Sequence, residues 1–420
     1  MSFFKFDSEI EKMSETALKK VKPVFEKIDE ITEYNQQKVL SSFRNNNVSE
    51  SCLGETTGYG YGDKGRDALE STFAEAVGAE SALVRHTLTC GTHTLTVALF
   101  GLLRPGDIML SATGTPYDTI LPTIGTAGEG GRGSLIDFGV KYKETALRED
   151  GSPDVDALIK ALKKEKIKLV YIQRSRGYSL RPSLSVKKID EIVRAVRENS
   201  DAVVMVDNCY GEFVEKEEPT DVGADIIAGS LIKNPGGGIA KNGGYIAGKK
   251  KLVELCSYRM TTPGLGAEVG ASLGHTREMF MGLFNAPHVT GEALKTAAYT
   301  AALFEEMGFV SSPRFDEDRH DIIEAIKLKN SENLIAFCRG LQSGAPVDSF
   351  VVPEPWDMPG YDSKVIMAAG TFTLGSSIEL SGDAPLREPF AVWMQGGLNF
   401  HSAKVAVNFA AEAVKIQNSK

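Results

Sequence analysis

Short apolar runs alternate with helical patterns through the middle of the chain, and this alternation limits the possible folds more than any other feature. The runs that read as buried strands are Ala82–Val84, Ile108–Ser111, Leu135–Asp137, Leu169–Gln173, Val203–Asp207, Ile226–Ser230 and Tyr245–Ala247. Helical patterns separate several of them, at Thr92–Leu103, Val155–Lys164 and Ile189–Glu198. The order predicts an α/β fold in which helices flank a mostly parallel, seven-stranded sheet.

The two ends of the chain show different patterns. Residues 8–43 have apolar positions at steps of three and four, which predicts an amphipathic helix that Pro23 interrupts or kinks. After residue 291, helical patterns occur together with strand-like runs, which is typical of a smaller α+β domain. Its expected elements are helices Glu292–Met307 and Ser402–Ile416 and strands Ser349–Val352, Val365–Ala368 and Phe372–Glu379. We therefore predict an N-terminal helical arm (1–50), a large domain (51–285) and a small C-terminal domain (286–420).

Composition excludes several classes of protein. A net charge of −9 without a long basic run argues against nucleic acid or an anionic membrane as the main partner. No apolar stretch reaches the roughly 18 residues that span a bilayer, and Met1–Ser8 lacks the pattern of a signal peptide. The 5 cysteines are scattered and form no C-x-x-C pair, which favours a cytoplasmic setting and no bound metal.

Three candidate site residues lie at or just after the ends of two buried strands. One apolar strand ends in Asp207, and another ends in Ser230, with Lys233 close behind it. In an open α/β sheet, ligands bind at the carboxyl ends of the strands. We expect desolvation to lower the pKa of Lys233 and make its amine nucleophilic. For a ligand that carries a pyridine ring and a phosphate, Asp207 would pair with the protonated ring nitrogen, and the hydroxyl of Ser230 would donate to the phosphate.

The segment Cys90-Gly91-Thr92-His93 lies between a predicted strand and a predicted helix. Free backbone N–H groups and the helix dipole make such a helix start an anion site. Cys90 is expected to be a buried spectator, and His93 is expected to be a packing or surface residue, with contact to a ring as the alternative. Tyr117, after the next strand, has the position of an aromatic platform for a flat ring.

The order of these pieces resembles that of the fold-type I enzymes that use pyridoxal 5′-phosphate (PLP). The closest resemblance is to the cystathionine and methionine lyase group, through Val206-Asp207-Asn208 and Ser230-Leu-Ile-Lys233. Other stretches are similar to the branch called aluminium resistance protein or cystathionine β-lyase-like, namely Tyr171–Tyr178, Lys233–Ala240 and Gly375–Ser381. The resemblance extends from about Lys38 to the C-terminus.

This resemblance implies a set of roles in a PLP site. Lys233 would form the internal aldimine and shuttle the proton of the substrate's Cα atom. Asp207 would hold the pyridinium nitrogen, and Tyr117 would stack on the ring. Phosphate would be bound by Gly91, Thr92 and Ser230, beside Cys90 and His93. The implied reaction is cleavage of a carbon–sulfur bond in an amino acid.

Further roles concern a second subunit and the substrate. The resemblance implies a homodimer or homotetramer with shared active sites, in which the loop of Tyr59 and Tyr61 helps to bind phosphate and to catalyse. The substrate carboxylate would be held by an arginine, with Arg387 as the first candidate and Arg176 as the second. One departure from the lyase pattern is Ile232, which stands where the family has threonine before the lysine, so one phosphate hydroxyl is missing. The stretch Gln173–Arg176 would compensate for it, and Arg176 is therefore also expected to bind the cofactor.

Other functions remain open from the sequence. Aldol cleavage, transfer as in selenocysteine synthase, and a regulatory protein with the PLP fold all suit the same motifs. Nucleotide binding would use Gly60–Gly65, which matches G-x-G-x-x-G, or Gly243–Lys249, which matches G-x-x-x-x-G-K. The first match lacks a preceding strand because Asn45–Thr57 is too polar. The second has Lys250 at the magnesium-binding position and reads as a strand at Gly244–Gly248.

Overall fold

The computed structural model describes residues 3–358 and 363–419. Contacts divide the chain into two compact units. Unit 1 consists of Met1–Tyr34 and Pro287–Lys420, and unit 2 consists of Asn35–Ala286. The division falls inside two long helices, α1 (Ser8–Asn45) and α8 (Thr276–Glu306). The division into domains 1–50, 51–285 and 286–420 stays a prediction.

Unit 2 is built on the predicted sheet. Its strands are β1 (Ser81–Arg85), β2 (Ile108–Ser111), β3 (Lys141–Glu144), β4 (Leu169–Gln173), β5 (Val203–Asp207), β6 (Ile226–Ser230) and β7 (Gly244–Gly248). They form a 7-stranded sheet in the order β1-β7-β6-β5-β4-β2-β3. Pairing is parallel from β6 to β3, while β7 runs antiparallel to both of its neighbours. The mostly parallel α/β fold is thus confirmed.

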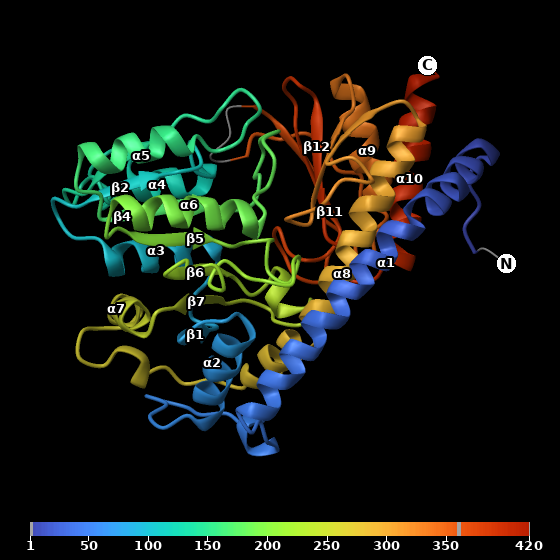
Figure 1. Cartoon of the computed structure of the whole chain (residues 1–420). Coiled ribbons are helices and arrows are strands. Elements are labelled where there is room, and N and C mark those ends of the chain that lie inside the picture. The colour runs from blue at the N-terminus through green and yellow to red at the C-terminus, as the bar shows by residue number, and fades with distance from the viewer. Residues whose placement is uncertain (1–2, 359–362, 420) are drawn as a thin grey trace. The chain divides into compact units, whose positions relative to one another are not determined.

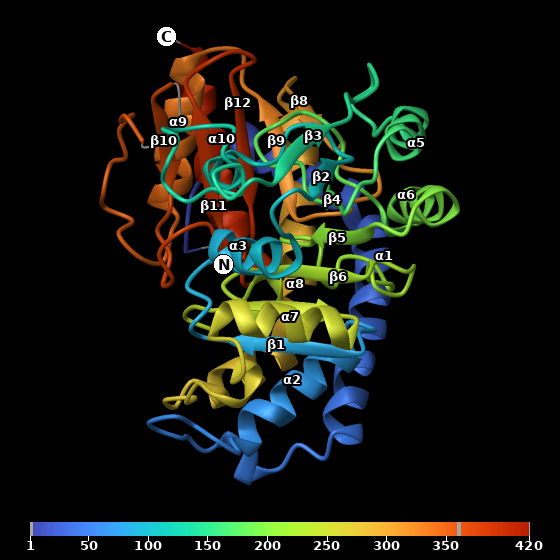
Figure 2. The same cartoon turned by 90° about the vertical axis from the view of Figure 1, so that its left-hand side faces the viewer.

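Helices cover both faces of this sheet, as Figures 1 and 2 show from two sides. One face packs against α2 (Lys64–Ala76), α5 (Val155–Lys164) and α6 (Val186–Asn199), and the other against α3 (Gly91–Leu102) and α7 (Lys250–Met260). Alternate residues of the central strands enter the two cores because successive side chains of a strand point to opposite faces. In β5, for example, Val204 and Val206 enter one core and Met205 the other. Burial on both faces explains why these strands are continuous apolar runs.

One predicted strand of unit 2 is wrong. Leu135–Asp137 forms a turn, and the neighbouring strand β3 is instead the polar segment Lys141–Glu144. β3 lies at the edge of the sheet and pairs only with β2, and most of its residues are exposed. An apolar run is therefore not required there. The turn before it resembles a buried strand because it contains apolar residues, of which Leu135 is buried in the core.

Unit 1 is α+β. Its 5-stranded antiparallel sheet has the order β10-β11-β12-β9-β8. The strands are β8 (Val310–Ser312), β9 (Ile323–Lys327), β10 (Val365–Ala368), β11 (Ser381–Pro385) and β12 (Ala391–Gln395). The helices α9 (Ser331–Ser343) and α10 (Phe400–Asn418) complete its core together with parts of α1 and α8.

Three predictions for these segments are corrected. Ser349–Val352 and Phe372–Glu379 are not strands, and Phe350 and Phe372 in them are largely exposed. Apolar residues there are surface residues of loops rather than the buried side of a strand. α1 continues through Pro23, so the interruption is wrong, while the kink that the sequence offers as the alternative stays a prediction. A proline removes a single N–H donor from the helix, and the residues on both sides here keep their apolar periodicity.

The described residues include no helix with both the length and the hydropathy that a bilayer crossing requires.

Candidate active site

The carboxyl ends of β5 and β6 bring the predicted acid and amine together. Asp207 pairs in register with Ala228, so Asp207 and Ser230 end adjacent parallel strands. Lys233 follows in the loop after β6, and its Nζ atom lies 3.1 Å from the hydroxyl of Tyr210. The same Nζ atom lies 4.2 Å from the centre of the Tyr210 ring. Sequence reasoning missed Tyr210, although its position just after the strand ending in Asp207 was a usable signal.

The surroundings of Lys233 shift the pKa of its amine in the direction opposite to the expected one. Burial lowers the pKa of its amine, but Tyr210, Cys209 and Asp207 outweigh burial and raise the pKa above its ordinary value. The predicted fall of the pKa is therefore wrong for this chain. The fold places these acidic groups beside the amine, and their attraction for its proton exceeds the effect of desolvation.

Asp207 is almost fully buried. The hydroxyl of Tyr171 donates to its Oδ2 atom at 3.2 Å, and the N–H of Cys209 donates to Oδ1 at 3.1 Å. Burial raises the pKa of Asp207, while these donors and Lys233 partly oppose that rise. The carboxyl group is thus held in a fixed orientation where a buried positive charge would stabilise its ionised form.

The start of α3 lies against the end of β6. A Cβ atom added to Gly91 would lie 3.4 Å from Cβ of Ser230 and 3.6 Å from Sγ of Cys209. Cys90 is the N-cap of α3, and its Sγ accepts from the N–H of His93 at 3.4 Å. Within the described part of the chain, the N–H groups of Gly91 and Thr92 have no acceptor in the protein, as is usual for a helix start. Such donors suit an anion.

At this helix start, one observation differs from the expectation and two contacts add to it. Cys90 is exposed rather than buried, because an N-cap residue stands outside the first turn of its helix. His93 is half-buried, and its Nδ1 atom lies 3.1 Å from the N–H of Thr89. The hydroxyl of Thr92 contacts that of Thr119 at 2.8 Å.

Tyr117 is positioned by the segment that follows β4. Its N–H donates to Oε1 of Gln173 at 2.6 Å, and its ring lies edge-on to that of Tyr178 at 5.7 Å. Gln173 is in register with Asp207 on β5, which places the Tyr117 backbone next to the acid. Arg176, in the same segment, is buried. The roles of Tyr117 and Arg176 toward a ligand stay predictions.

The remaining predicted residues lie on the surface. Tyr59 and Tyr61 are exposed and their rings stack at 5.6 Å. Their loop is anchored, since the N–H of Gly270 donates to the carbonyl of Tyr59 at 2.9 Å. Arg387 is exposed in the turn between β11 and β12 of unit 1. Their roles in catalysis and substrate binding stay predictions.

Glu212 is a second titratable group of this region that the sequence did not suggest. Its side chain is completely buried, and the hydroxyl of Tyr245 donates to its Oε1 atom at 2.7 Å. Burial raises the pKa of Glu212 from 4.5 to about 8. The folded protein therefore keeps a proton here that the unfolded chain releases at lower pH. This contribution to stability is complete below the unfolded pKa and is lost as pH rises toward the folded pKa.

We expect Glu212→Gln to remove this pH dependence, because glutamine keeps the shape of the acid and does not ionise. Between about pH 5 and pH 8 the wild type should lose up to about 1.4 kcal/mol of unfolding free energy per pH unit relative to the variant. Chemical denaturation of both proteins across this range measures the difference. Parallel pH profiles would show that Glu212 is ionised in the folded state.

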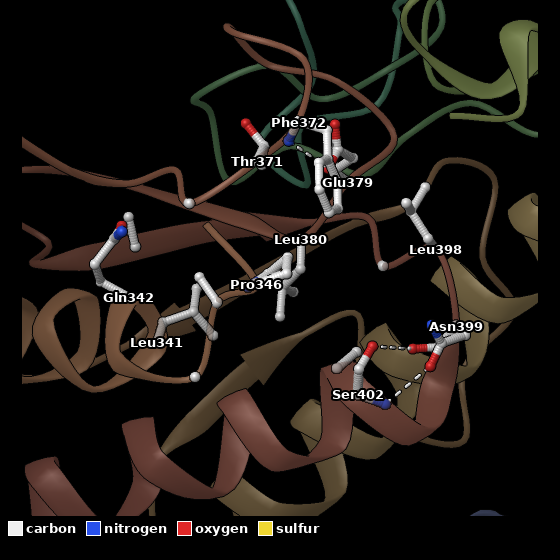
Figure 3. Close-up of a pocket in the computed structure, with 16 residues that line it drawn as sticks. Leu341, Gln342, Pro346, Thr371, Phe372, Glu379, Leu380, Leu398, Asn399 and Ser402 are labelled. Atoms are coloured by element: carbon white, nitrogen blue, oxygen red, sulfur yellow. Dashed lines mark hydrogen bonds between the residues drawn. The ribbon is translucent and has the colours of Figure 1, made fainter. Parts of the chain in front are cut away.

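Unit 1 contains a cavity of about 240 Å³ between the end of α9, the loop after β10 and the start of α10. Figure 3 shows Phe372 and Glu379 on one side of it and Asn399 and Ser402 on the other. The carboxylate of Glu379 accepts from the N–H groups of Phe372 at 2.9 Å and Thr373 at 2.7 Å. Oδ1 of Asn399 accepts from the N–H of Ser402 at 2.9 Å. These side chains are thus engaged in holding the backbone around the cavity.

The site of unit 2 has the arrangement of one class of enzyme. An amine and a buried acid lie at the carboxyl ends of neighbouring parallel strands, and a helix start opened by glycine lies beside them. This arrangement on a mostly parallel sheet defines the fold-type I PLP enzymes. The comparisons with known proteins agree with this class.

The family model described as methionine gamma-lyase matches residues 10–415, and the chain belongs to this family of PLP-dependent carbon–sulfur lyases. An uncharacterized protein, YnbB of Bacillus subtilis, is 49% identical over 392 residues, which are 93% of each chain. A crystal structure described as a carbon-sulfur lyase involved in aluminum resistance, from Clostridium novyi, is 49% identical with a TM-score of 0.94. That match covers 97% of this chain and 96% of the other.

A more distant structure supports the fold alone. The PLP-dependent protein YhfS from Escherichia coli is 15% identical, with a TM-score of 0.63 over 93% of this chain and 97% of its own.

Proposed function

We propose that this enzyme uses PLP, held on Lys233, to eliminate a sulfur leaving group from an amino acid. The reaction would be of the cystathionine β-lyase or methionine γ-lyase type. The observation that carries the proposal is the contact set around Lys233, whose amine is within reach of Tyr210 and faces the buried Asp207 beyond the ends of β5 and β6. Family membership supports it, since carbon–sulfur cleavage is the common chemistry of that group.

The residues present fit the cofactor. Lys233 would hold its aldehyde carbon covalently, and Asp207 would face its ring nitrogen as a fixed, buried carboxylate. The open N–H groups of Gly91 and Thr92 supply donors for a phosphate, and Ser230 lies beside Gly91 with a hydroxyl. Tyr117 supplies an aromatic face in the neighbouring segment. These residues thus offer an amine for the aldehyde, a carboxylate for the ring nitrogen and hydrogen-bond donors for the phosphate.

When bound, PLP draws electrons away from the Cα atom of an amino acid. The chain's own groups would do the rest. Lys233, once its amine is free, would take the Cα proton at Nζ and later return a proton to the product side. Asp207 would keep its charge because a positive ring nitrogen compensates for burial. Arg176 or Arg387 would bind the substrate carboxylate in a bidentate manner.

We also propose that the enzyme works as a homodimer or homotetramer. The exposed, stacked pair Tyr59 and Tyr61 would then contribute to the site of a second subunit. Solution scattering gives the number of subunits, and loss of activity in Tyr59→Ala and Tyr61→Ala proteins of unchanged assembly would support a shared site.

The nucleotide-binding alternative has less support. The glycine-rich loop at Gly60–Gly65 leads into α2, but in the described chain the segment before it is a short 3-10 helix (Glu50–Leu53) and a loop. Gly244–Gly248 is the strand β7 rather than a phosphate loop. Neither segment has the strand–loop–helix context that such a site needs.

The test combines a spectrum with parallel assays. The full-length protein loaded with PLP should absorb in the visible region and should release a thiol from cystathionine or methionine. Threonine, as a substrate for aldol cleavage, should give much less product. The proposal fails if threonine is the better substrate, or if ATP or NAD raises the unfolding temperature and PLP does not.

A further inference from the structure

Tyr210 contacts Lys233 with two parts of its side chain. The phenol oxygen accepts from Nζ at 3.1 Å, and the ring centre lies 4.2 Å from the same atom. Tyr210 is 9% exposed, so both contacts are largely shielded from water. A hydrogen bond that involves an ionised amine is stronger than one between neutral groups.

The backbone at Tyr210 is held in a conformation that tyrosine rarely adopts. Its φ is +70°, in the left-handed region, which is unfavourable for a bulky residue. The next residue, Gly211, approaches Arg174 so closely that an added Cβ would lie 2.4 Å from Cδ of that arginine. Arg174 also donates to Asn208 at 2.8 Å. Packing around the loop thus fixes the turn that directs the phenol at Lys233.

We propose that Tyr210 is a catalytic residue of this lyase, whose phenol oxygen holds the proton on Nζ of Lys233 after the amine has taken it from the substrate. In that step the Cα–H bond breaks, its electron pair stays with the substrate, and its proton forms a new N–H bond on Lys233. Tyr210 stays neutral and accepts the hydrogen bond of the ammonium group. The inference rests on the proposed function of Lys233.

Other acidic groups also face the amine. Asp207 and Cys209 come from the end of β5 and the loop after it, and both favour the protonated form of Lys233. Tyr210→Phe leaves these two groups and the ring in place and removes only the oxygen. The variant therefore isolates the hydrogen bond from the cation–π contact.

The experiment measures how fast the full chain, freed of cofactor, develops its visible absorption after PLP is added. Only the unprotonated amine reacts with the aldehyde. Loss of the acceptor lowers the pKa of Lys233, so Tyr210→Phe should react about tenfold faster near pH 8. Its rate profile should also be displaced to lower pH. In the loaded variant, exchange of the substrate's Cα proton with deuterated solvent should slow.

Two further variants complete the test. Tyr299→Phe removes another buried phenol, which lies in unit 1 and bonds to Asn408, and it should leave the rate profile unchanged. Tyr210→Asn suits the left-handed backbone and lacks the phenol, so it should shift the profile in the same direction as Tyr210→Phe. No visible absorption in the wild type would refute the function of Lys233. Absorption in all proteins with one common pH profile would refute the role of Tyr210 alone.

Discussion

Lys233→Ala is expected to lower turnover by about 10³-fold or more, because it removes both the attachment point of the cofactor and the base for the Cα proton. The variant should also lack the visible absorption of the wild type after incubation with PLP. Binding of the phosphate end, at the start of α3, should persist, since Gly91 and Ser230 are untouched. Steady-state assays and absorption spectra of equal amounts of the two proteins measure the effect.

Lys241→Ala is the matched control. Lys241 follows in the same part of the chain, but its side chain is largely exposed and pairs with Glu278 at 2.6 Å. Its removal should change turnover by less than about twofold, because exposed ion pairs contribute little. Equal losses in both variants would mean that Lys233 acts through general stability rather than chemistry.

Arg174→Ala is expected to destabilise the protein by about 3–5 kcal/mol. Arg174 is fully buried, and its two terminal nitrogens contact Glu215 at 2.9 Å and Glu218 at 3.4 Å. Glu218 is itself completely buried, so alanine at position 174 would leave its charge uncompensated in the core. The free energy of unfolding from chemical denaturation measures the loss.

The same change should affect the active site, because Arg174 supports the loop that carries Tyr210. The control is Arg194→Ala, which removes an exposed arginine paired with Asp190 on the surface of α6. We expect a cost below about 1 kcal/mol for that change. If Arg174→Ala were as mild as the control, the buried network would not be the support that the contacts indicate.

The sequence predicted the central strands of unit 2 well because each is buried on both faces. Val203–Asp207 and Ile226–Ser230 have the bounds that their apolar runs suggested. Burial is a property that residue types express directly, so a pattern search finds such strands. It cannot find an exposed edge strand such as β3, whose residues are Lys141-Tyr-Lys-Glu144.

The strands of unit 1 show a second reason why strands cannot all be predicted from apolar runs. β11 has the sequence Ser381-Gly-Asp-Ala-Pro385, yet all its residues are buried. Ser381 and Asp383 are polar although both are buried, so a pattern of apolar residues does not mark this strand. Hydrophobic loop residues such as Phe350 were mistaken for strand because they are apolar and yet exposed.

The candidate site could be predicted from the sequence only in part. Asp207, Ser230 and Lys233 could be found because the first two end buried strands and the third follows in the next loop. The position of Tyr210 just after β5 can be read from the sequence, but its contact with Lys233 depends on a left-handed turn that a tyrosine does not signal. The pKa of Lys233 depends on three acidic neighbours acting together, and their combined effect emerges only when the loop is folded.

The most direct test of the account is to find which residue carries the cofactor. The full chain is loaded with PLP, reduced with borohydride, digested and sequenced by mass spectrometry. We expect one modified residue, Lys233, with the mass of the reduced cofactor on its side chain. A modification spread over exposed lysines, or confined to a lysine other than Lys233, would contradict it.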